Sequence, residues 1–364
     1  MLEDSVSACV DSTGEGVDPL YSESAARAQG GLSPSIDRSG NIVLVPHGSP
    51  LLEAVGLRKS YGSRLVLDGV SIAVNAGEIV GLLGPNGAGK TTTLSLLATL
   101  LEPDAGTVRI NGATPSPRHY ALRRRLGFVP QAIALYPSLS AFQNLELFSR
   151  LHGVSKSQAR SDSMRVLQEV GLADRSDDPV AVLSGGMKRR LNLACGMVHG
   201  PDLLLLDEPT VGVDPQSREQ ILDTVRHAAE AGAAIVYSTH YMEEVERICS
   251  RALLIDNGKV VAAGTITELI ALGGRQTLME ITFRHSAPPN WCAGLTGITP
   301  IPGGSNNGKV ALQLESFALV DPILERARIA GAQVLEFSVH SANLSDAFIA
   351  LTGHALRDPA RDAH

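Results

Sequence analysis

The chain has few cysteines, few aromatic residues and no long apolar run. Its four cysteines are scattered over 364 residues and form no C-x-x-C pair. They therefore predict neither a metal site nor a disulfide framework, and they favour a reducing compartment. No apolar run approaches the ~20 residues that cross a bilayer, and the N-terminus lacks the basic and then apolar regions of a secretory signal. We expect a cytosolic protein that does not cross a membrane and acts on one only from the cytosolic side.

The chain also lacks an excess of positive charge. Its net charge is −7 and its pI is about 5.8, which argues against nucleic-acid binding through a broadly basic surface. The length predicts two domains with room for a tail. Residues 1–49 are rich in Ser, Gly, Asp and Ala, a composition that predicts a disordered N-terminal extension, with a docking or regulatory role as the alternative.

A glycine-rich loop at residues 84–91 is the strongest signal in the chain. It follows an apolar run, residues 79–83, that predicts a buried strand, and it leads into a predicted helix. In that context the spacing G-x-x-x-x-G-K-T predicts a phosphate-binding loop, in which backbone N–H groups and a helix N-terminus face the phosphates. Lys90 then reaches the β and γ phosphates, and the Thr91 hydroxyl can bind Mg²⁺. The predicted nucleotide-binding residues are Gly84, Pro85, Asn86, Gly87, Ala88, Gly89, Lys90, Thr91 and Thr92.

An acidic pair follows a second apolar run. The leucines at 203–206 predict a buried parallel strand, and Asp207 and Glu208 come at its C-terminal end, which is where ligands bind in open α/β sheets. We expect Asp207 to hold Mg²⁺ and Glu208 to act as the base that polarises the attacking water. The alternative, a solvent-exposed turn, leaves two adjacent carboxylates with nothing to bind.

Four weaker signals each carry a second interpretation. Tyr61 either stacks on an adenine ring or simply packs. The Gln131 amide either binds Mg²⁺ or orients water. The segment Ser184, Gly185 and Gly186 is either a plain helix cap or a second anion site of the same physical type. His240, which ends a predicted strand, is either structural or reaches the γ-phosphate.

Taken in order, these segments resemble the ATP-binding subunits of ABC transporters over residues 51–272. Tyr61 matches the adenine-stacking aromatic, and residues 84–91 match the Walker A loop. The Q-loop glutamine is matched by Gln131, and the signature by residues 183–187. Walker B is matched by residues 203–207, and the switch histidine by His240. The resemblance makes Glu208 the catalytic glutamate, assisted by Lys90 and His240, and Asp214 the D-loop aspartate. Met187 stands where many family members carry Gln, and Ser184, Gly185 and Gly186 are intact.

The resemblance also implies a fold and an assembly. The expected fold is α/β: a P-loop ABC ATPase domain with a mixed sheet, a helical subdomain and an antiparallel β part, plus a small α+β C-terminal domain. Two such domains pack head to tail with each ATP between Walker A of one and the signature of the other, so the family implies a homodimer or a heterodimer with a similar ATPase. The expected domains are 1–49 (disordered), 50–273 (ATPase), 276–354 (accessory) and 355–364 (flexible tail).

The expected function is that of an exporter's ATPase. The C-terminal pattern resembles the daunorubicin-resistance and nodulation-factor export ATPases, which implies ATP and Mg²⁺ as cofactors and a separate membrane permease as partner. A drug, a lipid or a lipo-oligosaccharide-like amphiphile is the implied substrate, and the cytoplasmic face of the membrane is the implied location. A soluble ABC ATPase acting on ribosomes or DNA is the alternative, and an import motor is a third. Against the alternative, the chain has one set of motifs, with no heptads and no cysteine clusters between Walker A and the signature.

Overall fold

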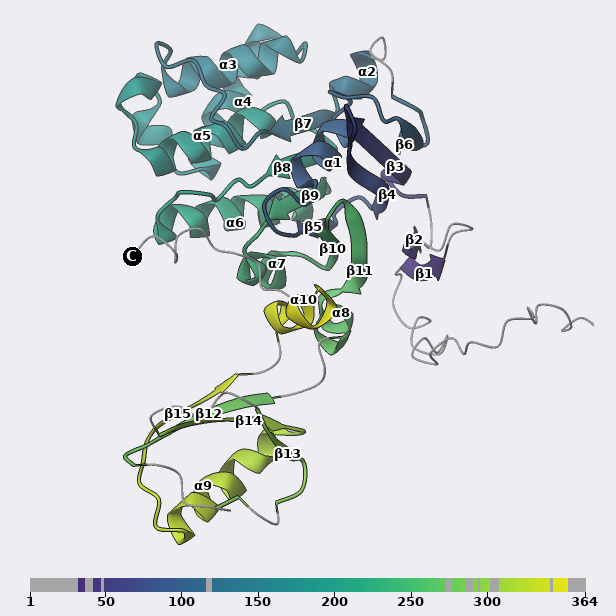
Figure 1. Cartoon of the computed structure of the whole chain (residues 1–364). Helices are drawn as coiled ribbons and strands as arrows, with labels where there is room; N and C mark the ends of the chain where they lie inside the picture. Colours follow the sequence, from purple (N-terminus) through teal and green to yellow (C-terminus); the bar gives the residue numbers. More distant parts are fainter. Residues whose placement is uncertain are drawn as a thin grey trace, which may run out of the picture.

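A six-stranded sheet lies at the centre of the predicted ATPase domain (Figure 1). The computed structural model describes residues 32–36, 42–46, 49–115, 120–272, 277–285, 291–292, 295–301, 308–340 and 343–352. The strand order is β11-β10-β5-β9-β8-β7, with β10, β5, β9, β8 and β7 parallel and β11 antiparallel at the edge. The bounds are β5 Ile79–Leu83, β7 Leu126–Val129, β8 Leu203–Asp207, β9 Ala234–Thr239, β10 Arg251–Asp256 and β11 Lys259–Thr265. Every residue of β5, β8 and β9 is buried, as expected for parallel strands covered on both faces.

Different layers cover the two faces of this sheet. One face packs against helix α1 (Lys90–Leu97) and an antiparallel sheet of β4 (Arg64–Val74), β3 (Leu52–Tyr61) and β6 (Ala105–Ile110). The other face packs against α6 (Pro215–Glu230), α7 (Met242–Ile248) and α8 (Ile266–Leu272). The predicted α/β class, with its mixed sheet and antiparallel part, is confirmed.

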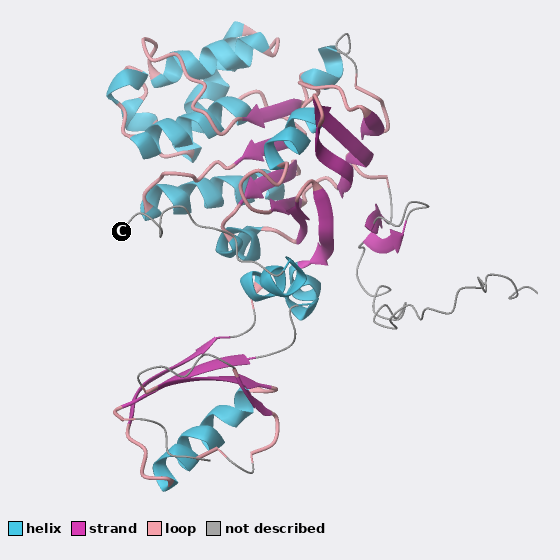
Figure 2. Ribbon diagram, viewed as in Figure 1, coloured by secondary structure: helices cyan, strands magenta, loops and turns pink. Residues whose placement is uncertain are grey.

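Three helices form a subdomain of their own beside strand β7 (Figure 2). They are α3 (Ala141–Leu151), α4 (Lys156–Glu169) and α5 (Gly185–Met197), and they share one apolar core. Serines begin all of them: Ser140, Ser155 and Ser184 each accept a backbone N–H of the first turn. Such caps satisfy donors that have no partner inside the helix. A short helix, α2 (Tyr120–Arg123), precedes β7.

A smaller domain follows α8. Its four-stranded sheet has the order β13-β14-β12-β15, from β12 (Thr277–Phe283), β13 (Ile298–Pro300), β14 (Lys309–Leu314) and β15 (Val334–His340). Helix α9 (Val320–Ile329) covers one face through Val320, Ile323 and Ala327. This arrangement matches the predicted α+β accessory domain.

The last helix departs from the predicted domain boundary. Helix α10 (Leu344–Thr352) falls inside the predicted accessory domain, yet it packs on α8 and α7 of the ATPase domain. Leu344 and Phe348 are fully buried in the core that includes Leu269, and the Leu344 N–H donates to Glu246 at 2.7 Å. A stretch with this spacing of apolar residues can bury them against any apolar surface, so the sequence does not say which domain receives them. The chain thus leaves the ATPase domain and returns to it.

The N-terminal segment also differs from the prediction where it is described. Strands β1 (Leu32–Ile36) and β2 (Ile42–Pro46) form an antiparallel pair inside the segment predicted to be disordered, because the apolar run at residues 42–45 is long enough for a strand. Residues 1–31 and the predicted tail, 355–364, lie outside the described residues. Within the described parts of the chain, no helix has the length and apolar character needed to cross a membrane.

Candidate functional site

The glycine-rich loop connects β5 to α1, as predicted, and its backbone requires glycine. Gly87 and Gly89 have φ of +84° and +104°, in the region that side chains avoid. A Cβ on Gly84 would lie 2.2 Å from the Ile255 carbonyl oxygen, and one on Gly89 would lie 2.5 Å from Leu67 Cδ2. The loop therefore fits closely against β10 and β4, and its own backbone is exposed toward solvent at Asn86 and Gly87.

Lys90 begins helix α1 and points back into the loop. Its Nζ donates to the carbonyl oxygens of Gly84 and Pro85 at 2.8 and 3.1 Å, and it lies 3.1 Å from Glu208 Oε1. The Lys90 side chain is only 5% exposed. A buried ammonium of this kind is held by partners that a phosphate oxygen can replace.

Glu208 is the point at which the predicted residues converge. Besides Lys90, its carboxylate lies 3.3 Å from His240 Nδ1 and accepts a hydrogen bond from Gln131 Nε2 at 3.2 Å. These partners come from α1, the loop after β9 and the loop after β7, so the sheet topology brings them together. Burial is the largest influence on the pKa of Glu208 and acts to raise it, but His240 and Lys90 together outweigh it and leave the pKa below its ordinary value.

The backbone at Glu208 is in an uncommon conformation. Its φ is +46°, which costs about 1–2 kcal/mol for a residue with a side chain. The Glu208 N–H donates to the Ser238 carbonyl at 3.1 Å and to Ser238 Oγ at 3.2 Å, which holds this turn at the end of β8. The turn aims the carboxylate at Lys90, away from its own strand.

Asp207 is deeply buried beside Thr91. Its exposed fraction is 1%, and burial is the main reason that its pKa is raised. Hydrogen bonds from Ser238 Oγ, at 2.8 Å, and from the Thr91 side chain oppose that shift. A hydroxyl and one carboxylate next to a phosphate loop form a donor set that Mg²⁺ uses, because that ion keeps water and phosphate oxygens as further ligands. Gln131 donates an amide N–H to Glu208, so the amide oxygen of Gln131 points away from that carboxylate.

The signature segment belongs to a separate part of the surface. Ser184 caps α5 through its hydrogen bond from the Met187 N–H at 3.2 Å. A Cβ on Gly186 would lie 2.2 Å from Ser217 Oγ and 2.8 Å from Asp214 Oδ1, whereas one on Gly185 would meet nothing within 4 Å. Among the described residues, no hydrogen bond or ion pair joins residues 184–186 to the phosphate loop, so the structure does not bring these two predicted halves together within one chain.

The remaining predicted residues sit at the edges of this site. Tyr61 ends β3 and is 50% exposed, so its ring is available for stacking. Asp214 caps α6 by accepting the Ser217 N–H at 2.9 Å. That hydrogen bond is the main reason that the pKa of Asp214 is lowered.

Sequence reasoning missed Arg189 as a functional candidate. From α5 its guanidinium donates to the Gln131 carbonyl oxygen and, at 3.3 Å, to the Val211 carbonyl oxygen. Burial lowers the pKa of Arg189, while the charges of Glu208 and Asp207 act in the opposite direction, so the guanidinium lies within electrostatic reach of both carboxylates. It links the loop that carries Gln131 to the loop that follows Glu208. The only local signal was its place in a basic run.

A buried network missed by sequence reasoning positions His240. Glu244 is 2% exposed and accepts from Tyr237 Oη at 2.9 Å and from Thr239 Oγ1 at 2.8 Å. Thr239 Oγ1 in turn accepts the Tyr241 N–H at 3.0 Å. The residues on both sides of His240 are therefore fixed to helix α7.

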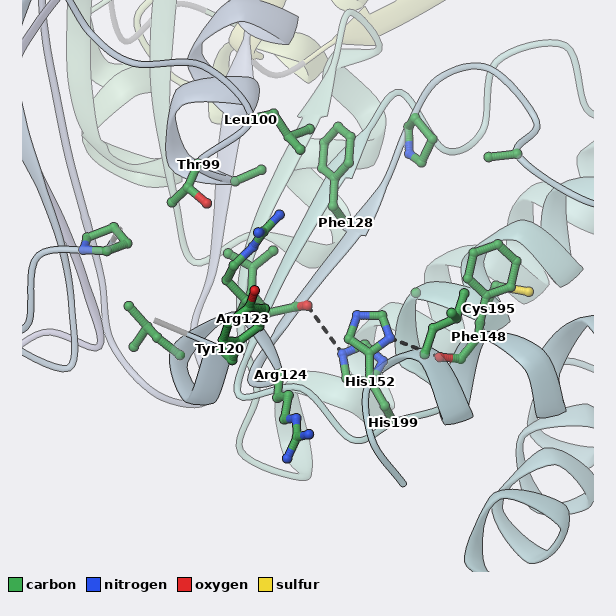
Figure 3. A pocket seen from close by; sticks show the side chains of 18 of the residues that line it. Thr99, Leu100, Tyr120, Arg123, Arg124, Phe128, Phe148, His152, Cys195 and His199 are labelled. Carbon is green, nitrogen blue, oxygen red and sulfur yellow. Dashed lines mark hydrogen bonds between the residues drawn. The ribbon is translucent and has the colours of Figure 1, made fainter. Parts of the chain in front are cut away.

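A cavity of about 470 Å³ lies away from the phosphate loop, between the sheet and the helical subdomain. Figure 3 shows its labelled residues, which include Tyr120 and Arg123 of α2, Phe148 of α3 and Cys195 of α5. His152 and His199 stack in it with ring centroids 3.7 Å apart. Burial, and then the neighbouring His152, lowers the pKa of His199 to about 4.

Comparisons with known proteins agree with this geometry. A family model described as ABC transporter matches residues 67–211. The matched residues include the glycine-rich loop, Gln131, the signature segment and the acidic pair.

The chain belongs to the ABC transporter ATP-binding proteins, which are ATPases. It is 37% identical over 311 residues to the linearmycin resistance ATP-binding protein LnrL of Bacillus subtilis (85% of this chain, 100% of that protein). It is also 37% identical to the Nod factor export ATP-binding protein I of Ralstonia nicotianae (85% and 96%) and to the daunorubicin/doxorubicin resistance protein DrrA of Streptomyces peucetius (84% and 94%). A solved ATP-binding subunit of an ABC transporter superposes with a TM-score of 0.56 at 33% identity (60% and 91%). The predicted family and export subgroup are confirmed.

Proposed function

We propose that this chain hydrolyses ATP to power export of an amphiphile through a separate membrane permease. The observation that carries the ATPase part is the convergence of Lys90, Gln131 and His240 on Glu208. The export direction is supported by the relatives, whose names describe export of Nod factor and resistance to antibiotics. A ribosomal or DNA-processing role is not favoured.

Binding of ATP changes the partners of Glu208. The γ-phosphate of the substrate replaces Glu208 as the partner of the Lys90 ammonium, because a phosphate carries more charge than a carboxylate. Pairing with phosphate withdraws the Lys90 ammonium from the Glu208 carboxylate, which is then free to accept the proton of the attacking water. His240 and Lys90 then stabilise the charge on the transferring phosphoryl group.

A bound Mg²⁺ would supply further stabilisation of phosphate charge. We propose that Thr91 and Asp207 hold it, with Gln131 through its amide oxygen. Asp207 would hold the ion through its water shell, which leaves Glu208 available as the base. The nucleotide itself lies along residues 84–92, with its adenine on Tyr61.

We also propose that two copies are needed for one complete site. The signature residues Ser184, Gly185 and Gly186 present an exposed helix start at Ser184 and Gly185 that makes no hydrogen bond to its own phosphate loop. In a head-to-tail dimer this helix start faces the ATP of the second copy, where its N–H groups and dipole stabilise the γ-phosphate. A heterodimer with a similar ATPase offers the same arrangement.

The permease would contact the cavity between α2, α3 and α5 (Figure 3), at the cytoplasmic face of the membrane. Its rim exposes Tyr120 (72%) and Leu151 (67%), two large side chains that a bound permease segment would cover. The loop that carries Gln131 lies beside this cavity, since Pro130 and Ala134 line it. A segment seated there can therefore influence the Mg²⁺ and water positions directly.

The test is recovery of a membrane partner. Tagged Glu208→Gln protein, loaded with Mg-ATP, is purified from detergent-solubilised membranes of its own host, and its partners are identified. We expect a polytopic membrane protein in a fixed ratio. Leu151→Glu, added to Glu208→Gln, should abolish its recovery, whereas Leu151→Glu alone should keep the basal ATPase activity of the wild type. The matched control, Ile349→Glu, changes an exposed apolar residue of α10 (42%). Recovery of ribosomal or DNA-processing proteins, with no membrane protein, would contradict the transport function.

A further inference from the structure

The two edges of the accessory sheet are built differently. Strand β13 is three residues long and ends in Pro300, and a short strand with a proline is a common way to prevent further pairing. Strand β15 is seven residues long, contains neither proline nor lysine, and pairs with β12 alone among the described strands. Neither proline nor lysine therefore blocks this edge along β15, whose one acidic residue is Glu336.

This edge also exposes apolar side chains. Phe337 lies opposite Ile281 of β12, which is fully buried, yet Phe337 itself is 46% exposed. The neighbouring Leu335 is 62% exposed. Edge strands normally carry charge at such positions to prevent aggregation, so exposed apolar residues on an open edge indicate a surface that is covered in the functional assembly.

The register of β15 favours pairing with itself. The pairing with β12 shifts between Thr282 and Phe283, so the regular part of β15 runs from Glu336 to His340 with Ser338 at its centre. In an antiparallel pair related by a two-fold axis at Ser338, Phe337 of one copy lies opposite Val339 of the other. Both positions are on the face that α9 covers, since Val339 lies opposite the buried Met279. Glu336 of one copy does not lie opposite Glu336 of the other, so the pairing places no like charges opposite each other.

We propose that β15 pairs antiparallel with β15 of a second copy of this chain and joins the two accessory sheets into one. The contact is isologous, as expected of a two-fold dimer, and its backbone hydrogen bonds resemble those of added-strand recognition. The inference goes beyond the ATP-dependent contact of the ATPase domains, because nothing in it requires nucleotide. It keeps two copies together through the part of the cycle in which the ATPase domains separate.

The experiment is cysteine cross-linking of the full-length protein. Cys9 and Cys292 are changed to Ser, which leaves the buried Cys195 and Cys249, and Ser338→Cys is added. Residues opposite each other in an antiparallel pair have Cα atoms about 4.5–5.5 Å apart, within the range of about 4.4–6.8 Å that a disulfide spans. We expect mild oxidation without nucleotide to give at least about fivefold more covalent dimer than the control Thr299→Cys, which lies on β13 at the opposite edge.

A second substitution tests the apolar contact. Phe337→Lys, added to Ser338→Cys, should remove the cross-link. Phe317→Lys should preserve it, because Phe317 is also exposed (65%, against 46% for Phe337) but lies in the turn before α9. Dimer yield from Ser338→Cys no higher than from Thr299→Cys, or unaffected by Phe337→Lys, would overturn the proposal. So would a cross-link that forms only with Mg-ATP. ATPase activity is measured in parallel, because its loss would indicate failure of the nucleotide site instead.

Discussion

His199 makes the stability of this protein depend on pH below neutrality. Its imidazole is buried against His152, and its Nε2 lies 3.2 Å from the Leu126 carbonyl oxygen. These surroundings lower the pKa of His199 to about 4 from an ordinary value of 6.5. The folded state thus keeps His199 neutral at a pH at which the unfolded chain binds a proton.

The sign and size of the effect follow from linkage. Above pH 6.5 neither state binds the proton, so His199 does not change the free energy of unfolding there. As the pH falls from 6.5 to 4, the unfolded state gains about 1.4 kcal/mol per pH unit relative to the folded state. That slope sets an upper bound of about 3.5 kcal/mol across the window, and partial solvent access reduces the expected loss to ~1–2 kcal/mol.

The assay compares two proteins at matched pH. The free energy of unfolding is measured by urea denaturation for the wild type and for His199→Gln at pH 7.5, 6.0 and 5.0. The carboxylates titrate equally in both, so the difference isolates His199. At pH 7.5 we expect the variant to be less stable than the wild type. Between pH 7.5 and 5.0, however, its free energy of unfolding should fall by less than that of the wild type. Parallel pH profiles for the two proteins would refute the reasoning.

Three further changes test separate parts of the structure. Arg189→Lys keeps the charge but cannot bridge two carbonyl oxygens, so kcat for ATP hydrolysis should fall about tenfold with little change in KM. The control Lys188→Gln should preserve both constants. An equal loss of kcat in the two variants would contradict a positioning role for Arg189. Gly186→Ala should lower the Tm of the nucleotide-free protein, because the new Cβ would lie 2.2 Å from Ser217 Oγ, at a cost of about 1–3 kcal/mol. Gly185→Ala should leave the Tm unchanged. Equal Tm values for the two variants would count against the packing described. Phe348→Ala should cost about 3–4 kcal/mol in urea unfolding of the ATPase domain, and no loss there would mean that α10 does not stabilise it.

The sequence predicts well the parts of the site whose chemistry is local. The loop at residues 84–91 and the strand ending in Asp207 and Glu208 each combine a buried run with a specific spacing, so their place at one edge of the sheet follows from parallel topology. The contacts of Glu208 with Gln131 and His240 were not predictable in detail. They depend on the left-handed backbone at Glu208, and a glutamate in the sequence does not indicate a positive φ.

Features that depend on distant packing were not predictable. Arg189 reaches Gln131 across the interface between the helical subdomain and the sheet, and a basic run gives no sign of that contact. The apolar stripe of α10 could pack on either domain. It packs on the ATPase domain because α8 offers an apolar surface there, which the sequence of α10 does not reveal. Strand β2 forms where composition predicts disorder, because a short apolar run within a polar segment suffices for one strand.

The central claim, that Glu208 is the base of an ATPase, is tested most directly by Glu208→Gln. The substitution keeps the size of the side chain and removes its charge. We predict that binding of a fluorescent ATP analogue is preserved and that steady-state hydrolysis falls by a factor of about 100 or more. The matched control, Glu243→Gln, alters an exposed acid of α7 and should hydrolyse ATP like the wild type. Hydrolysis at the wild-type rate in Glu208→Gln would contradict the account.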